Sequence, residues 1–158
     1  TRAIGRRVTS KDCRFMVTKS EMKGIQGWFL KRLGCFSIDQ LSPSLSVLRN
    51  AVNLIVNKNL LVVFPEGKIN KYRKKLMLKE GLYRLALLAA KKTNSILIIP
   101  IGIAYSQVSP EIRGKASLCF GEPLLVKNQP DLSIKDFNEI LNKRMLNAEK
   151  LALENVGR

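Results

Sequence analysis

The stretch Leu60-Leu61-Val62-Val63-Phe64-Pro65-Glu66-Gly67-Lys68-Ile69-Asn70 decides how the rest of this sequence is interpreted. Its five apolar residues are typical of a buried strand, and the strand runs straight into a Pro-Glu-Gly turn. Because Pro65 fixes φ and lacks an N–H, and because Gly67 can adopt a positive φ, the chain can turn sharply at this point. The sequence therefore predicts a strand that delivers one carboxylate, Glu66, and exposed backbone to a surface loop.

A dense group of basic residues follows the turn: Lys68, Lys71, Arg73, Lys74 and Lys75. Backbone N–H groups and Lys or Arg side chains together are a common way to hold an anion, above all a phosphate. We therefore expect an anion site around this loop. The alternative from this stretch alone is an ordinary strand-to-loop turn with a solvated basic face.

The charge of the chain is strongly asymmetric. The 158 residues carry 28 Lys and Arg against 12 Asp and Glu, a formal net charge of +16, and 20 of the basic but only 5 of the acidic residues lie in 1–92. Such a field attracts nucleic acid, an anionic membrane surface or phosphorylated substrates. Nucleic acid is disfavoured as a partner, because no ribonucleoprotein motif, paired zinc-ligand pattern or basic zipper is present.

Histidine is absent from the sequence, so these residues contain no group for histidine-based acid–base chemistry. The three cysteines, Cys13, Cys35 and Cys119, are widely spaced among apolar neighbours, which favours reduced thiols used for packing over a disulfide framework or a metal site. The longest apolar run is far shorter than the ~18 residues of a membrane span. Any contact with a membrane is therefore expected to be peripheral. Because the first residue is Thr rather than Met, we expect the chain to be a piece of a longer one.

Apolar periodicity predicts an α/β fold in which a mixed sheet is flanked by helices. We expect strands at 14–19, 34–40, 60–64, 96–104 and 116–120, and helices at about 20–33, 42–57, 82–92 and 133–152. Ser20, Ser42 and Ser133 are the expected N-caps, with Pro43 at the first position of the second helix.

The predicted helix at 20–33 allows two interpretations. Its apolar residues, Met22, Ile25, Trp28, Phe29 and Leu33, lie on one side and are accompanied by Lys23, Lys31 and Arg32. Aromatic residues at helical spacing usually pack in a core. The alternative is an interfacial segment that inserts its aromatic rings among lipid headgroups while the cations contact anionic lipid.

Several blocks in this order resemble the glycerolipid acyltransferases, the lysophosphatidate (1-acylglycerol-3-phosphate) acyltransferase family. The central block is Phe64-Pro65-Glu66-Gly67. The other blocks that carry the resemblance are Gly34-Cys35-Phe36-Ser37-Ile38-Asp39, Leu78-Lys79-Glu80-Gly81, Ile98-Ile99-Pro100-Ile101 and Phe120-Gly121-Glu122-Pro123-Leu124. The resemblance covers about 14–124, within a single acyltransferase-like domain over 1–158 whose residues 125–158 form a C-terminal helical extension.

The resemblance implies transfer of a fatty acyl group from acyl-CoA or acyl carrier protein to a hydroxyl of a lysophosphatidate-type glycerol phosphate, which gives phosphatidate in phospholipid biosynthesis. In the family a His-x4-Asp pair supplies the general base. This pair is absent here, and we expect it to lie upstream of Thr1, so the chain is expected to be inactive alone; loss of the base in a pseudoenzyme is the alternative. No cofactor other than the acyl donor and no metal is implied. The expected location is peripheral, on the cytoplasmic side of a membrane.

The resemblance also implies a set of substrate-binding residues: Asp39, Gln40, Pro65, Glu66, Gly67, Lys68, Lys71, Arg73 and Lys79. Two positions depart from the family pattern. Gln40 stands where the family often has Arg, and Lys68-Ile69 stands where Thr-Arg usually follows Pro-Glu-Gly. Both departures remove a guanidinium that could bind phosphate through two bonds, so the lysines or Arg73 would supply the charge.

Each role has a plainer alternative. Glu66 either shapes the acceptor pocket or caps local amides in its turn, and Lys79 is either a ligand or a solvated lysine at a helix start. For the whole chain, the alternative function is a non-catalytic module that binds anionic lipid or nucleic acid. A structural fragment that holds no site is a third possibility.

Overall fold

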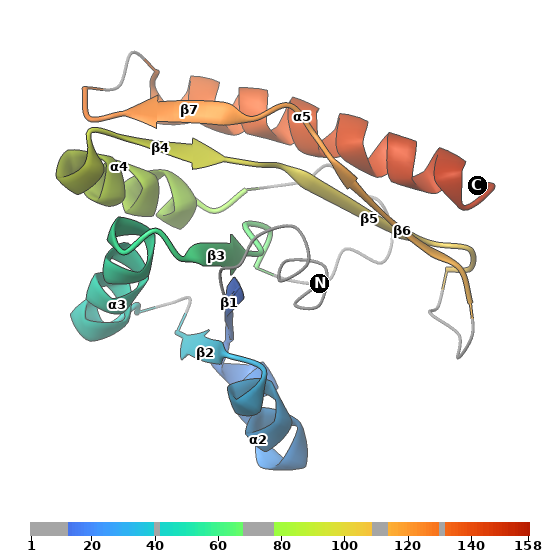
Figure 1. The fold of residues 1–158 in the computed structure, drawn as a ribbon, viewed down its shortest axis with the longest axis horizontal. Helices are drawn as coiled ribbons and strands as arrows, with labels where there is room; N and C mark the ends of the chain where they lie inside the picture. Colours follow the sequence, from blue (N-terminus) through green and yellow to red (C-terminus); the bar gives the residue numbers. More distant parts are fainter. Residues whose placement is uncertain (1–12, 40–41, 68–77, 109–113, 130–131) are drawn as a thin grey trace.

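A computed structural model describes residues 13–39, 42–67, 78–108, 114–129 and 132–158. It is a mixed α/β structure with helices against its sheets (Figure 1), as the sequence predicts. The elements are, in chain order, β1 (Cys13–Thr18), the 3-10 helix η1 (Lys19–Met22), α2 (Gly24–Arg32), β2 (Cys35–Ile38), α3 (Leu45–Val56), β3 (Leu60–Val63), α4 (Gly81–Thr93), β4 (Ser95–Ile98), β5 (Ile101–Tyr105), β6 (Ala116–Phe120), β7 (Leu124–Lys127) and α5 (Ile134–Asn155).

The first half forms a parallel sheet in the order β2-β1-β3. In its register Met16 of β1 is opposite both Phe36 of β2 and Val63 of β3. These side chains point to one face, where Met16 packs with Ala51 and Val52 of α3 and with α4. All three strands run in the same direction, so the segments that follow β2 and β3 both leave the sheet at the carboxyl-terminal end of the strands.

The second half consists of two antiparallel pairs, β4 with β7 and β5 with β6. The prediction of a single strand at 96–104 is wrong, because Ile99 and Pro100 separate two strands, β4 and β5. Proline has no N–H to donate to a strand ladder, so the pairing stops there. The carbonyl of Pro100 nevertheless accepts a bond of 2.8 Å from Gly121 N, which keeps the two pairs in line.

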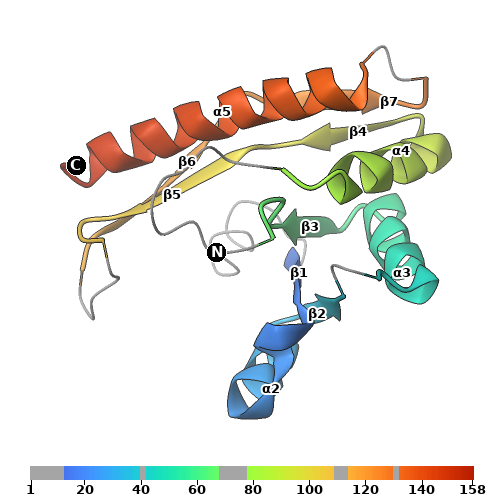
Figure 2. The same cartoon turned by 180° about the vertical axis from the view of Figure 1, so that it is seen from behind.

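Helix α5 lies along the antiparallel strands, as both views show (Figures 1 and 2). It approaches β5 so closely that a Cβ added to Gly102 would lie 2.2 Å from the carbonyl carbon of Ala148. Phe137 and Leu141 of α5 are fully buried in a core that includes Tyr83 of α4 and Leu124 of β7. The ring centroids of Tyr83 and Phe137 lie 5.0 Å apart, and the Tyr83 hydroxyl donates to the carbonyl of Leu132 at 2.7 Å.

Most expected elements are present, but two expected caps are wrong. Ser44 rather than Ser42 caps α3, since its hydroxyl accepts from Val47 N. Ser20 lies within η1, and α2 begins only at Gly24, whose φ is +57°. Ser133 caps α5 as expected, because its hydroxyl accepts from Asp136 N at 3.2 Å.

Three further points concern expectations from the sequence. Strand β7 was not expected, and the turn expected at Ser109-Pro110 lies outside the described residues. The three cysteines form no disulfide with one another: Cys13 is buried, and Cys35 and Cys119 are half-buried. Among the described residues, no helix combines the length and the hydrophobicity needed to cross a bilayer.

Candidate functional site

The candidate site begins at a tight turn that ends β3. Gly67 N donates to the carbonyl of Phe64 at 3.1 Å, which closes a four-residue turn with Pro65 second and Gly67 last. These are the positions that Pro and Gly favour in a type I turn, and the φ of Gly67 is +68°. Pro65 is buried and Glu66 half-buried. The predicted turn is therefore present, with the carboxylate of Glu66 at its third position.

The chain returns to this turn before α4. Lys79 N donates to the carbonyl of Pro65 at 2.8 Å, so the Lys79 segment lies against the Pro-Glu-Gly turn. The Lys79 side chain belongs to an exposed residue, and Glu80 next to it forms an exposed ion pair with Arg84 at 3.0 Å. The amides of Gly67 and Lys79 both donate within the protein. An anion at this loop would therefore depend on other amides or on side chains rather than on these two.

Glu66 has an unusual electrostatic environment. Its partial burial raises the pKa of the carboxyl group above the ordinary glutamate value, and the negative charge of Glu149 on α5 raises it further. Both effects disfavour the ionised form. Glu66 consequently holds a proton more tightly than an exposed glutamate does.

Asp39 lies at the carboxyl-terminal end of the parallel strands, as the turn after β3 does. It follows β2 directly, is exposed, and accepts a bond of 3.3 Å from Ser42 N through Oδ1. Since β1 lies between β2 and β3, the chain positions at the two strand ends are roughly 10 Å apart across the sheet. Of the other predicted site residues, Gln40, Lys68, Lys71 and Arg73 lie outside the described residues.

A family model described as Acyltransferase matches residues 3–104. The chain belongs to the acyltransferase family. No curated protein and no solved structure matched it. The matched segment contains β1 to β4, most of β5, the turn at Glu66 and the return at Lys79, so the family assignment and the candidate site coincide in the sequence.

Two residues of α5 with long-range interactions, Glu149 and Arg144, lie outside this acyltransferase match and were not expected from the sequence. Glu149 belongs to α5, beyond residue 104, yet its charge acts on Glu66. Arg144, also on α5, holds the Gly-Glu-Pro block: it donates to the carboxylate of Glu122 at 2.9 Å and to the carbonyl of Pro123. Only the docking of α5 against the strands reveals these contacts, and no local sequence signal indicates them.

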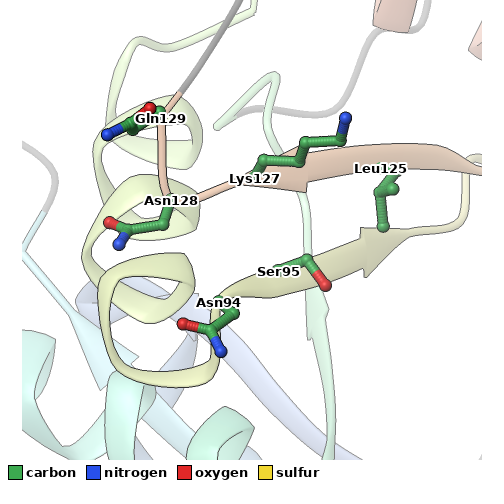
Figure 3. Close-up of a pocket in the computed structure, with 6 residues that line it drawn as sticks. All are labelled: Asn94, Ser95, Leu125, Lys127, Asn128 and Gln129. Carbon is green, nitrogen blue, oxygen red and sulfur yellow. The ribbon is translucent and has the colours of Figure 1, made fainter.

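The structure also has a shallow hollow of about 560 Å³ at the beginning of β4 and the end of β7 (Figure 3). Its lining residues are Asn94, Ser95, Leu125, Lys127, Asn128 and Gln129. None of the predicted site residues lines it. Lys127 is its single charged residue, so this acyltransferase's chemistry is better sought at the turn after β3 than in the hollow. Among the described residues, no cluster of three metal-ligating side chains is present.

Proposed function

We propose that the protein transfers a fatty acyl group from acyl-CoA or acyl carrier protein to a hydroxyl of a lysophosphatidate-type glycerol phosphate, giving phosphatidate. The observation that carries the proposal is the half-buried Glu66 in the turn after β3, inside the segment that matches the acyltransferase family. The bond from Lys79 N to the carbonyl of Pro65 holds the Lys79 segment against this turn. The basic first half of the chain suits an acceptor that carries a phosphate.

In the proposed reaction the acceptor hydroxyl oxygen attacks the thioester carbonyl carbon, the carbon–sulfur bond breaks, and the thiol leaves with the proton. Glu66 orients the acceptor by a hydrogen bond to a hydroxyl, and Lys79 contributes positive charge near its phosphate. The general base is the His-x4-Asp pair that the resemblance implies. Because the 158 residues contain no histidine, we expect this chain alone to bind the acceptor without turning it over.

The test measures release of free thiol and formation of phosphatidate by the product of the complete reading frame, with acyl-CoA or acyl carrier protein as donor. We expect one phosphatidate per thiol, and for Glu66→Gln a loss of at least about ten-fold in kcat/KM, the scale of a lost substrate-orienting contact. Glu139→Gln makes the same chemical change on an exposed part of α5 and should retain full activity.

Two results would contradict the proposal. Thiol release that does not depend on the glycerol phosphate would indicate a thioesterase. Salt-sensitive binding of lysophosphatidate without any transfer by the complete protein would favour the alternative, an anion-binding module. Full activity in Glu66→Gln would contradict the role assigned to Glu66 while leaving the reaction in place.

A further inference from the structure

Helix α2 exposes large apolar side chains. Ile25, Trp28 and Phe29 are 88%, 58% and 56% exposed. Their spacing of three and four residues places them on one side of the helix. The expectation that these three residues pack in a core is therefore wrong. Exposed large apolar side chains that cluster on one side of a helix mark a contact with a partner or a membrane.

The exposed cluster lies on a helix that packs closely against the preceding 3-10 helix, η1. Gly27, on the other side of α2, is buried, and a Cβ there would lie 2.2 Å from the carbonyl oxygen of Met22. The helix thus packs tightly against η1. In both views α2 projects from the sheets at the end of the molecule away from α5 (Figures 1 and 2). The cluster is consequently presented outward rather than toward the rest of the chain.

Positive charge surrounds the cluster. Between Lys19 and Arg32 there are four basic residues, all exposed, and one acidic residue, Glu21, which accepts a bond of 3.0 Å from Gln26. The Arg32 guanidinium carbon lies 4.5 Å from the centre of the Trp28 ring. An aromatic ring with a cation above it combines an apolar body with a charged rim, which suits the boundary between lipid headgroups and acyl chains.

We propose that η1 and α2, residues 19–32, dock the protein peripherally on an anionic lipid bilayer, with Trp28 and Phe29 entering the headgroup boundary. Charge decides between possible occupants of this surface. An anionic bilayer, such as the cytoplasmic leaflet, complements the local excess of basic residues and the net charge of +16. A second copy of this chain would bring the same positive charge against itself.

Trp28 is the only tryptophan among the 158 residues, so the fluorescence of this chain reports directly on this surface. The experiment titrates the purified protein with vesicles of phosphatidylcholine alone and with vesicles containing phosphatidylglycerol. With the anionic vesicles we expect a blue shift of the emission and quenching by lipids brominated in the upper acyl chain. The neutral vesicles should bind at least about ten-fold more weakly.

Matched variants locate the surface by vesicle sedimentation. Replacing Phe29 and Ile25 by serine should weaken partitioning at least about ten-fold and leave Trp28 as a probe. The control replaces Leu146 and Leu151, two apolar residues of α5 that are 47% and 51% exposed, by serine, and should change partitioning less than two-fold. Lys23→Ala with Lys31→Ala should cost about five-fold per charge, and the corresponding pair on α5, Lys135→Ala with Lys143→Ala, should cost less than two-fold.

Several results would overturn the proposal. Absence of binding, equal binding to neutral vesicles, or binding without a change in Trp28 emission would each remove α2 as the docking surface. A concentration-dependent blue shift without lipid would instead identify a second copy as the occupant. These measurements need no acyl transfer, so the docking surface and the proposed reaction can fail independently.

Discussion

The raised pKa of Glu66 comes from its immediate surroundings. Glu66 is the third residue of the turn that Gly67 N closes on Phe64, and its partial burial, with the charge of Glu149, raises the pKa of its carboxyl group. A group whose pKa is higher in the folded than in the unfolded protein binds its proton more tightly when folded. Stability from this group is therefore complete below about pH 4 and is lost as the pH rises through the folded pKa.

This relation predicts how the stability of the Glu66→Gln variant, relative to that of the native protein, changes with pH. The amide cannot ionise, so the melting temperature of the variant should rise relative to the native protein as the pH goes from 4 to 8. Calorimetry at a series of pH values measures the difference. Glu139→Gln makes the same chemical change on an exposed part of α5 and is measured at the same pH values as a matched variant. A difference for Glu66→Gln that is independent of pH would show that burial does not perturb the Glu66 carboxyl group.

At the scale of elements, the closest approach is that of α5 to β5 at Gly102. Glycine is required there by space, because the backbone of Ala148 and Glu149 occupies the volume of a Cβ. The contact also fixes the position of α5 along the strands. The residues of α5 that lie near the site, including Glu149, thus depend on a glycine on another element.

We predict that Gly102→Ala destabilises the protein by about 1–3 kcal/mol or more, since the added methyl group forces α5 away from β5. The matched control is Gly81→Ala in the first turn of α4, where an added Cβ meets no atom within 4 Å. It should be neutral or stabilising by up to about 1 kcal/mol, because alanine favours helix more than glycine does. Denaturant unfolding measures both, and equal stability of the two variants would contradict the close approach.

At the scale of the whole molecule, α4 joins two apolar clusters. Leu85 packs with Met16, Ala51 and Val52 of the parallel half. Tyr83, Ala86 and Ala90, from the same helix, pack with the core that contains Phe137. Because one rigid helix serves both clusters, we expect the parallel and antiparallel halves to unfold together.

Phe137→Ala tests this coupling. Phe137 is fully buried against Tyr83, and its truncation should cost about 3–5 kcal/mol. Hydrogen exchange monitored by mass spectrometry should then show lost protection in β1 and β3 as well as in α5 and β7. Lost protection confined to α5 and β7 would show that the two halves unfold separately.

The sequence was informative wherever a local signal determined the structure. The apolar run before Pro65 correctly indicated β3 and its turn, and Ser133 correctly indicated the beginning of α5. The errors arose where neighbouring signals competed. Ser44 caps α3 although Ser42 precedes a proline that suits a helix start, and Pro100 divides an apolar run that has the composition of one strand.

Long-range features were beyond prediction from the sequence. The effect of Glu149 on Glu66 depends on how α5 lies across the strands, and the residues between the two carry no pattern that indicates it. The exposure of Trp28 was one of two open alternatives, because composition does not show which side of a helix faces solvent. The substrate-binding roles of all nine expected site residues stay predictions, both for those that the structure describes and for Gln40, Lys68, Lys71 and Arg73.

The position of α5 at the end of the chain has a consequence for synthesis on the ribosome. Translation at about 5–20 residues per second separates Val63 from Asn155 by roughly 5–20 s. During that interval β1 to β3 and the turn at Glu66 exist without the helix whose Glu149 acts on that carboxylate and whose apolar face covers β5 and β6. A nascent chain thus carries the Pro-Glu-Gly turn before it has the electrostatic environment that raises the pKa of the Glu66 carboxyl group.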